Sequence, residues 1–150
     1  MIKYWQDNSA RMMQLTIEHA RMVLIALFIA FLVAIVLIAV FLRKKNWMNS
    51  LIYFFSLLYS VPSYAFFALL IPITGLGETT AIIVLAFYNE YVLLRTFITG
   101  IREVDPNYIE VARGMGMTQE EIFTKVQLPL SMPAIFSGLQ VALASTMAIA

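Results

Sequence analysis

The feature that most constrains this chain is an unbroken apolar run from Met22 to Leu42. At 1.5 Å per residue, a helix over this run spans about 30 Å, the thickness of the hydrocarbon core of a bilayer. Arg43, Lys44 and Lys45 follow it directly. This basic exit is a stop-transfer pattern, whereas a cleaved signal peptide ends in small residues. The run therefore predicts a retained transmembrane helix.

Composition places the whole chain in the same class. Its 150 residues are 61% hydrophobic and 13% charged, whereas soluble chains average about 25% charged residues. A formal net charge of +1 lacks the basic surplus that binding to nucleic acid requires. The absence of cysteine excludes disulfides and thiolate metal sites, and the single His19 cannot form a histidine-rich metal site by itself. We expect a protein of the lipid bilayer that binds neither nucleic acid nor metal.

Three more apolar segments follow, at about residues 48–71, 79–99 and 131–150. Pro62 lies in the middle of the second segment, where we expect it to kink the helix. Pro72 and two glycines predict a turn over residues 71–78. The expected fold class is an all-α integral membrane protein with about four transmembrane helices.

Small residues recur in two of these segments. Ala26, Ala30 and Ala34 fall four residues apart, which would let another helix approach closely. Alanine is also common in apolar helices generally, so the sequence leaves this packing role open. The last segment is rich in small residues that suit tight helix packing, namely Ser137, Gly138, Ala142, Ala144, Ser145 and Ala148.

The basic residues predict the orientation of the chain in the membrane. Seven of them lie in or beside the first and third connections (Arg43, Lys44, Lys45, Arg95, Arg102, Arg113 and Lys125), and the second connection has none. By the positive-inside rule, the first and third connections are cytoplasmic and the N-terminus is external. Lys3, Arg11 and Arg21 oppose this orientation, but they are outnumbered.

One candidate site lies inside the third segment, where Asn89 and Glu90 are adjacent. An ionisable group in a membrane span costs roughly 2.5–3.5 kcal/mol on insertion scales, so it requires an explanation. Arg95 follows five residues later and points about 140° away around a helix of 3.6 residues per turn, so we expect no pairing with Glu90. Glu90 either faces a polar cavity or another subunit, or it is protonated or paired inside the bundle. The sequence does not separate these two interpretations.

Charged residues return between the third and fourth segments, where the sequence predicts two short helices. Asp105 and Pro106 are typical of a helix start, and we expect this helix to run to Arg113 and stop at residues 114–116. Residues 118–121 match a capping box that starts a second helix, which we expect to end before Pro129. We call residues 105–129 the elbow. It is either a connector lying on the bilayer or a docking surface for a partner.

The elbow also resembles a known motif. Glu110-Val111-Ala112, three residues, Gly116, nine residues, and Val126-Gln127-Leu128-Pro129 is similar to the EAA motif of binding-protein-dependent ABC transporter permeases. That motif reads Glu-Ala-Ala, three residues, Gly, nine residues, Ile-x-Leu-Pro. Residues 60–77 and 99–133 resemble the osmoprotectant branch of these permeases. The resemblance covers the chain from about residue 48 onward, and Glu90 and Val92 depart from it.

The resemblance implies a function. Such permeases import glycine betaine, carnitine or choline across the inner (cytoplasmic) membrane of bacteria, and their loop helix docks on a cytoplasmic ATPase. By this resemblance, Glu110 would bond to the ATPase or brace the loop. Ala112, Gly114 and Gly116 would belong to the ATPase-coupling loop, with Ala112 and Gly116 allowing close approach. Leu128 and Pro129 would fix the re-entry of the chain into the membrane.

The resemblance also implies partners. These are the ATPase subunit, a second permease copy or a homologous permease, and an extracytoplasmic substrate-binding protein. The chain has no glycine-rich phosphate loop, so we expect it to be no enzyme, to bind no cofactor, and to leave ATP to its partner. Residues 1–150 are expected to form one permease domain that is incomplete at its C-terminus. The alternative is a membrane adaptor, or a truncated and non-transporting relic of such a permease.

Overall fold

The computed structural model describes residues 2–42 and 44–150, with the side chains of residues 2–7 and 45 left out of the description. Its elements are α1 (Ile2–Phe41), α2 (Lys45–Ser60), α3 (Ser63–Thr74), α4 (Glu78–Arg102), α5 (Pro106–Gly114), α6 (Gln119–Ile122), the π-helical η1 (Phe123–Gln127) and α7 (Leu128–Ile149). The described residues contain helices and no strand, and the expected all-α fold class is confirmed. The predictions that used the side-chain charges of Lys3, Arg43 and Lys45 lie outside the described residues.

Among the described residues, three helices are long and apolar enough to cross a membrane: Asn8–Phe41, Glu78–Arg102 and Gln119–Ile149. The bent pair α2 and α3 makes a fourth if it is counted as one span, so the expectation of about four spans is confirmed. Helix α1 begins well before Met22. Residues 8–21 contain neither proline nor glycine, so nothing in their sequence stops the helix from extending beyond the apolar run.

The prediction of a kink at Pro62 was wrong, because the chain breaks there into two helices bent by 95°. A proline pushes the residue before it out of the helical region. Val61 is accordingly extended (φ −71°, ψ 130°), and Pro62 follows with ψ 133°. The carbonyl oxygen of Val61 is left without a helical partner and accepts a hydrogen bond from the hydroxyl of Tyr88 on α4. A contact with a neighbouring helix therefore supports the break.

The turn expected over residues 71–78 is also shorter than predicted. Pro72 lies inside α3, which continues to Thr74, and the connection is reduced to residues 75–77. Proline has a φ close to the helical value and removes only one backbone hydrogen bond. This loss is tolerated when other groups satisfy the backbone.

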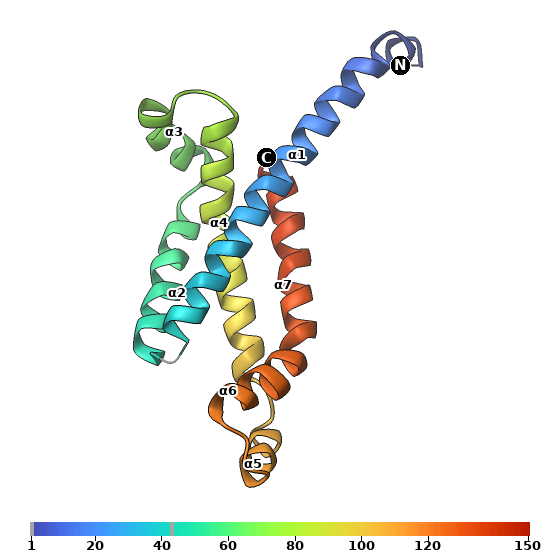
Figure 1. Cartoon of the computed structure of the whole chain (residues 1–150). Helices are drawn as coiled ribbons and strands as arrows, with labels where there is room; N and C mark the ends of the chain where they lie inside the picture. Colours follow the sequence, from blue (N-terminus) through green and yellow to red (C-terminus); the bar gives the residue numbers. More distant parts are fainter. Residues whose placement is uncertain (1, 43) are drawn as a thin grey trace.

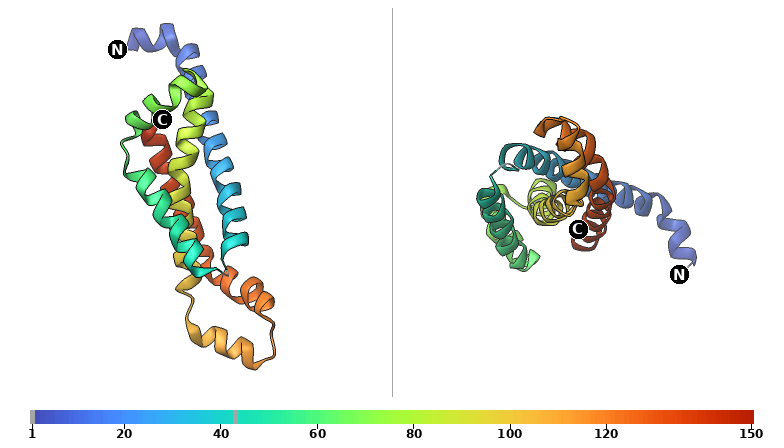
Figure 2. Two further views of the ribbon diagram at one scale, coloured as in Figure 1. Left: turned by 90° about the vertical axis from the view of Figure 1, so that its left-hand side faces the viewer. Right: turned by 90° about the horizontal axis from the view of Figure 1, so that it is seen from below.

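Helix α4 is the centre of the bundle and contacts α1, α2, α3 and α7 (Figure 2). The alanine stripe of α1 packs in this bundle, since Ala26, Ala30 and Ala34 are fully buried. The packing role that the sequence left open is thus confirmed. Phe31 of α1 meets Phe97 of α4 edge to face, with ring centroids 6.1 Å apart.

Helices α4 and α7 approach each other closely at two glycines, Gly100 and Gly138. A Cβ atom built on Gly138 would lie 2.2 Å from the hydroxyl of Thr96, and one built on Gly100 would lie 2.4 Å from the Cβ of Ala134. Of the small residues expected to pack in the last segment, Gly138 and Ala142 are buried and Ser145 is half-buried. The others, Ser137, Ala144 and Ala148, are exposed. The prediction of tight packing is confirmed on one face of α7 only.

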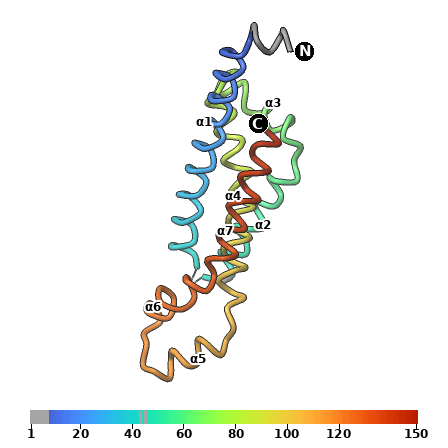
Figure 3. Tube along the Cα trace, turned by 90° about the vertical axis from the view of Figure 1, so that its right-hand side faces the viewer, coloured from blue at the N-terminus to red at the C-terminus, as the bar shows by residue number. Residues whose placement is uncertain are grey.

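The two ends of the bundle differ in the segments they carry (Figures 1 and 3). The connection from α1 to α2 lies at the same end as the elbow. The first half of α1 and residues 75–77 lie at the other end, where Arg21 of α1 pairs with Glu78 of α4 at 2.8 Å. This grouping is the one that the distribution of basic residues predicts. The assignment of the elbow end to the cytoplasm remains a prediction.

Candidate functional site

The elbow begins with a capped helix, as the sequence predicts. The Asp105 carboxylate accepts a hydrogen bond from the backbone N–H of Asn107 at 2.9 Å, and Pro106 occupies the first turn of α5. An aspartate cap satisfies one of the free amides at the helix start, and a proline there loses nothing. The sequence from 105 onward is therefore sufficient to start α5 where it does.

Gly116 ends this helix and reverses the chain. Its φ is +81°, a left-handed conformation that glycine adopts freely and a side chain with a Cβ does not. The N–H of Met117 donates to the carbonyl oxygen of Ala112 at 3.1 Å, and the N–H of Gly116 donates to that of Arg113 at 3.0 Å. These two bonds are those of a Schellman motif. Helix α5 thus has its backbone satisfied at both ends by local bonds.

The capping box expected at residues 118–121 is present. The Glu121 N–H donates to the hydroxyl oxygen of Thr118 at 3.3 Å, and the Thr118 N–H donates to the Glu121 carboxylate at 3.0 Å. Lys125 lies 2.9 Å from the other carboxylate oxygen. The hydrogen bond from Lys125, reinforced by those from Thr118, lowers the pKa of the Glu121 carboxyl to about 2. The group is therefore ionised at neutral pH, as its role as acceptor requires.

The second helix of the elbow does not end before Pro129, so that prediction was wrong. Helix α6 passes through the π-helical turn η1 directly into α7, and the N–H of Leu128 donates to the carbonyl oxygen of Phe123, five residues back. A proline has no N–H for the carbonyl four residues earlier, and its ring crowds that carbonyl. A wide turn just before Pro129 accommodates both constraints without ending the helix. The elbow therefore connects to α7 without a loop.

The residues expected to couple the elbow to a partner are not equally accessible. Glu110, Gly114, Gly116 and Pro129 are exposed and Leu128 is half-buried. Ala112 is buried on the inner side of α5, the element that contacts α6 and η1. In this structure Ala112 therefore allows close approach within the elbow itself, and the surface offered to a partner is made of other residues.

An apolar stripe on the outer face of α5 was missed by the sequence reasoning. Tyr108, Val111 and Met115 are 58%, 63% and 72% exposed, and they are spaced at i, i+3 and i+7, which places them on one helix face. This spacing in a short helix flanked by charges was the signal that could have found them. An exposed apolar stripe of this kind gives the elbow the character of a docking surface.

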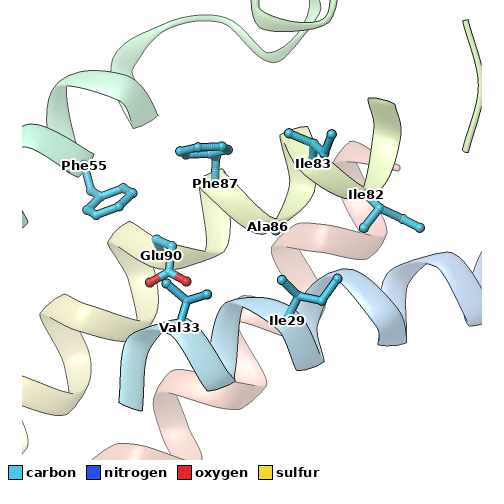
Figure 4. Close-up of a pocket in the computed structure, with 8 residues that line it drawn as sticks. All are labelled: Ile29, Val33, Phe55, Ile82, Ile83, Ala86, Phe87 and Glu90. Atoms are coloured by element: carbon cyan, nitrogen blue, oxygen red, sulfur yellow. The ribbon is translucent and has the colours of Figure 1, made fainter. Parts of the chain in front are cut away.

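The second candidate site lies in the middle of α4, where Glu90 is 4% exposed and neither carboxylate oxygen has a hydrogen-bond partner among the described residues. The carboxyl group borders a pocket of about 210 Å³ between α1, α2 and α4 (Figure 4). Eight residues line this pocket: Ile29, Val33, Phe55, Ile82, Ile83, Ala86, Phe87 and Glu90. The structure thus places Glu90 at a cavity, and the cavity is apolar.

Asn89 lies beside Glu90 but contacts a different helix. Its Oδ1 is 2.9 Å from the hydroxyl of Thr146 on α7, and its Nδ2 has no partner among the described side chains. The Thr146 hydroxyl also lies 2.6 Å from the carbonyl oxygen of Ala142. One hydroxyl hydrogen serves only one of these acceptors, so the Asn89 amide is incompletely satisfied. The two polar residues of the expected site therefore face different surroundings.

Arg95 does not pair with Glu90, in agreement with the sequence prediction. Its guanidinium donates to the hydroxyl of Tyr91 and lies 5.7 Å from the centre of the Tyr91 ring. The charge is held at the exposed side of α4, away from the pocket. Among the described side chains, those of residues 8–42, 44 and 46–150, no three histidine, cysteine or acidic groups are clustered as a metal site would require.

Comparison with known proteins adds a family to this geometry. The family described as the inner membrane component of binding-protein-dependent transport systems matches residues 26–150. The choline transport system permease protein of Bacillus subtilis (strain 168) is 36% identical over 140 residues, which cover 93% of this chain and 64% of that protein. The carnitine transport permease protein OpuCD of Listeria monocytogenes is 30% identical over 150 residues, which cover all of this chain and 67% of that protein.

A third relative is the glycine betaine/carnitine/choline transport system permease protein OpuCB of Bacillus subtilis (strain 168), which is 34% identical over 93% of this chain. The chain spans 64% of the length of the two Bacillus proteins. The expectation that similarity starts at about residue 48 was wrong, because the family match begins at residue 26 and takes in the apolar part of α1. The alanine stripe of α1 therefore lies within the family region.

Proposed function

The chain belongs to the family of inner membrane components of binding-protein-dependent transport systems, and we propose that it is the permease subunit of an ATP-driven importer of quaternary-amine osmoprotectants. It is a multi-pass protein of the bacterial inner membrane. The observation that carries the proposal is the elbow, a doubly capped helix that exposes an apolar stripe at one end of a bundle of membrane helices.

The substrate class rests on the relatives. The names of similar proteins specify choline, carnitine and glycine betaine. All three are small molecules that carry a quaternary ammonium group. We assign this class to the present chain, and we leave the choice among the three to the binding protein that would deliver the substrate.

The elbow would act as a lever between an ATPase and the membrane helices. Tyr108, Val111 and Met115 would enter an apolar groove of the ATPase, and Glu110 would bond at its rim. The cap at Asp105 and the turn at Gly116 satisfy the backbone at both ends of α5. They would help α5 to stay helical when the ATPase moves it. Since α6 continues through η1 into α7 without a loop, a movement of the docked helix α5 would reach α7 through the turn at residues 115–118 and α6. In this arrangement Leu128 and Pro129 set the angle at which α7 leaves the elbow.

The proposal includes three partners. A cytoplasmic ATPase subunit would bind and hydrolyse ATP, a second permease copy or a homologous permease would complete the translocation path, and an extracytoplasmic protein would deliver substrate. We propose that residues 1–150 belong to a single permease domain.

The docking part of the proposal is testable by cross-linking, because the chain has no cysteine of its own. A cysteine in place of Met115 should cross-link to the ATPase in membranes. A cysteine in place of Leu76, which is 90% exposed at the opposite end, is the matched control and should not. Intact cells are treated with a thiol reagent that reaches the outer face of the inner membrane but does not cross that membrane. The reagent should label a cysteine at position 76 and should not label one at position 115. Labelling of position 115 from outside would contradict the orientation.

The transport part is testable by reconstitution. The full-length permease, its ATPase and its binding protein in liposomes should take up radiolabelled choline, carnitine or glycine betaine only when ATP is enclosed. Loss of uptake on replacing Val111 by Asp, with the protein still in the membrane, would support the docking stripe. Gln119→Asp places the same charge on an exposed position of α6, outside the stripe, and should retain uptake. Failure of the reconstituted system to transport any of the three compounds would contradict the substrate class.

A further inference from the structure

The pocket beside Glu90 is unusual in composition, and it opens to the surface of the bundle, where its lining residues Ile29 and Phe87 are 41% and 40% exposed. Of its eight described lining residues, Glu90 alone is polar, and the others are five aliphatic residues and the two phenyl rings of Phe55 and Phe87. These rings have centroids 6.4 Å apart and are inclined by 36°. Figure 4 shows the carboxylate at one end of the pocket, next to Val33, with both rings nearby.

A carboxylate in such a setting needs a counter-charge or a proton. Both oxygens of Glu90 lack a hydrogen-bond donor in the part of the chain that the structure describes. Leaving a charged group unpaired in an apolar medium is among the costliest arrangements in a protein. Arg95, the nearest basic residue along α4, is held on Tyr91 instead. A counter-charge for the ionised form of Glu90 must therefore come from outside the described chain.

The lining restricts the chemistry of that partner. A calcium or magnesium ion needs about six oxygen ligands, and the pocket offers one carboxyl group. A primary ammonium has three N–H donors and a guanidinium has five, so most of them would be left unpaired against isoleucine, valine and phenylalanine. A quaternary ammonium has no N–H at all. Its positive charge is spread over an apolar surface, which is compatible with aliphatic walls and is attracted by the faces of aromatic rings.

We infer that Glu90, Phe55 and Phe87 form an intramembrane site for the quaternary ammonium group of the transported substrate. The inference rests on the proposed function and specifies where in the permease the substrate cation is stabilised. The volume of about 210 Å³ is the space of several water molecules, which is adequate for such a head group. The site lies in the middle of α4, the helix around which the bundle is built, where a substrate crossing the membrane would lose its hydration.

The first experiment measures uptake by the reconstituted full-length transporter. Glu90→Gln keeps the shape of the side chain and removes its charge, and it should lower the maximal rate of choline uptake by at least about tenfold. Glu18→Gln on the exposed part of α1 removes a charge that lies far from the pocket and should leave uptake unchanged. Phe87→Leu should reduce uptake less than Glu90→Gln does, because it removes one ring and keeps the charge. Membrane abundance and ATPase co-purification are measured for every variant.

The second experiment does not depend on transport. A single cysteine in place of Ala86, which lines the pocket, is treated with a thiosulfonate reagent that carries a trimethylammonium group and with methyl methanethiosulfonate, which is neutral. The quantity compared is the rate of reaction with the cationic reagent divided by the rate with the neutral reagent. This rate ratio should be about tenfold lower when Glu90→Gln is combined with the cysteine than when Glu90 is present. Choline should slow the reaction only when Glu90 is intact.

Three outcomes would overturn the inference. One is normal choline uptake by Glu90→Gln, and the second is a reagent ratio that does not depend on Glu90. The third is failure of the cysteine introduced by Ala86→Cys to react with either reagent, since a pocket closed to a small cation cannot bind a substrate head group. These outcomes can be told apart from failure of the proposed function. If the proposed function is wrong, the unaltered transporter itself takes up no quaternary amine.

Discussion

The elbow and the middle of α4 satisfy their polar groups in opposite ways. In the elbow, each end of α5 and the start of α6 is closed by a bond to a residue at most five positions away in the sequence. In α4, Asn89 reaches Thr146 across the bundle and Glu90 reaches no partner among the described residues. A segment that must keep its shape while exposed to water carries its own caps, whereas a buried segment depends on what packs against it.

This difference suggests a division of labour within the proposed permease. Under the proposed function, the local caps would keep the elbow rigid while it couples to the ATPase. Under the further inference, the unpaired carboxyl group of Glu90 on α4 would respond to the substrate cation. The predictions below test whether the two regions are independent, in order of decreasing expected effect.

The largest effect is expected where α4 and α7 meet. Gly138→Leu places its first side-chain atom 2.2 Å from the Thr96 hydroxyl, so the two helices must separate. Overpacking of this kind typically costs about 1–3 kcal/mol and occasionally more. The thermal midpoint in detergent should fall clearly, whereas Gly114→Ala, where a Cβ meets nothing within 4 Å, should leave it almost unchanged. Equal stability of the two variants would show that the bundle does not need this close approach.

The next effect is expected at Gly116, and it should be confined to the elbow. Gly116→Val forces a β-branched residue to a φ of +81°, which costs about 1–3 kcal/mol. Membrane abundance should be normal because insertion depends on the apolar helices. Co-purification of the ATPase and substrate uptake should both fall. Normal uptake by this variant would contradict the lever proposed for the elbow.

A smaller effect is expected from the capping box. Thr118→Ala removes the side-chain acceptor for the Glu121 N–H and should cost about 1 kcal/mol of local helix stability. Amide hydrogen exchange should accelerate in residues 119–123 and remain slow in α4. Thr118→Ser keeps the hydroxyl group and should behave like the unaltered protein. Faster exchange that spreads into α4 would show that the two regions are coupled after all.

The smallest effect is expected at the opposite end of the bundle. Arg21 and Glu78 are 2.8 Å apart, but both side chains are well exposed. Exposed ion pairs contribute about 0–1 kcal/mol, so Arg21→Ala should barely change the thermal midpoint. Repeating the measurement in about 1 M salt should remove the remaining difference, because salt screens exposed charges. A large loss of stability would mean that this pair fixes the position of α1.

The elbow shows how much local sequence can predict. Asp105, Gly116, Thr118 and Glu121 act on neighbours in the chain, so their residue types and spacing are sufficient to place both caps and the turn. The membrane helices were predicted for a similar reason. The lengths of apolar runs such as residues 22–42 are set by the thickness of the bilayer, whatever the helices pack against.

The helix boundaries that the sequence predicts wrongly lie at prolines, where tertiary contacts affect whether the helix continues. Pro62, Pro72 and Pro129 present the same local chemistry, yet the chain breaks at the first, continues through the second and passes the third by a π-helical turn. The outcome depends on which groups are available to replace the lost hydrogen bond. At the Pro62 break the compensating donor to Val61 is Tyr88, which lies 27 positions further along the chain. No pattern in the neighbouring sequence specifies such a donor.

The sequence by itself determined the fold class, the number of apolar spans and the design of the elbow, because helix caps and hydrophobic lengths are properties of short segments. Only the tertiary structure decided that the alanines of α1 are fully buried, that Ala112 points into the elbow, and that Glu90 borders an apolar pocket with two phenyl rings. The physical reason is that burial and pairing arise from helices far apart in the chain. Phe55, Phe87 and Ile29 meet around one carboxyl group only after α1, α2 and α4 have packed together.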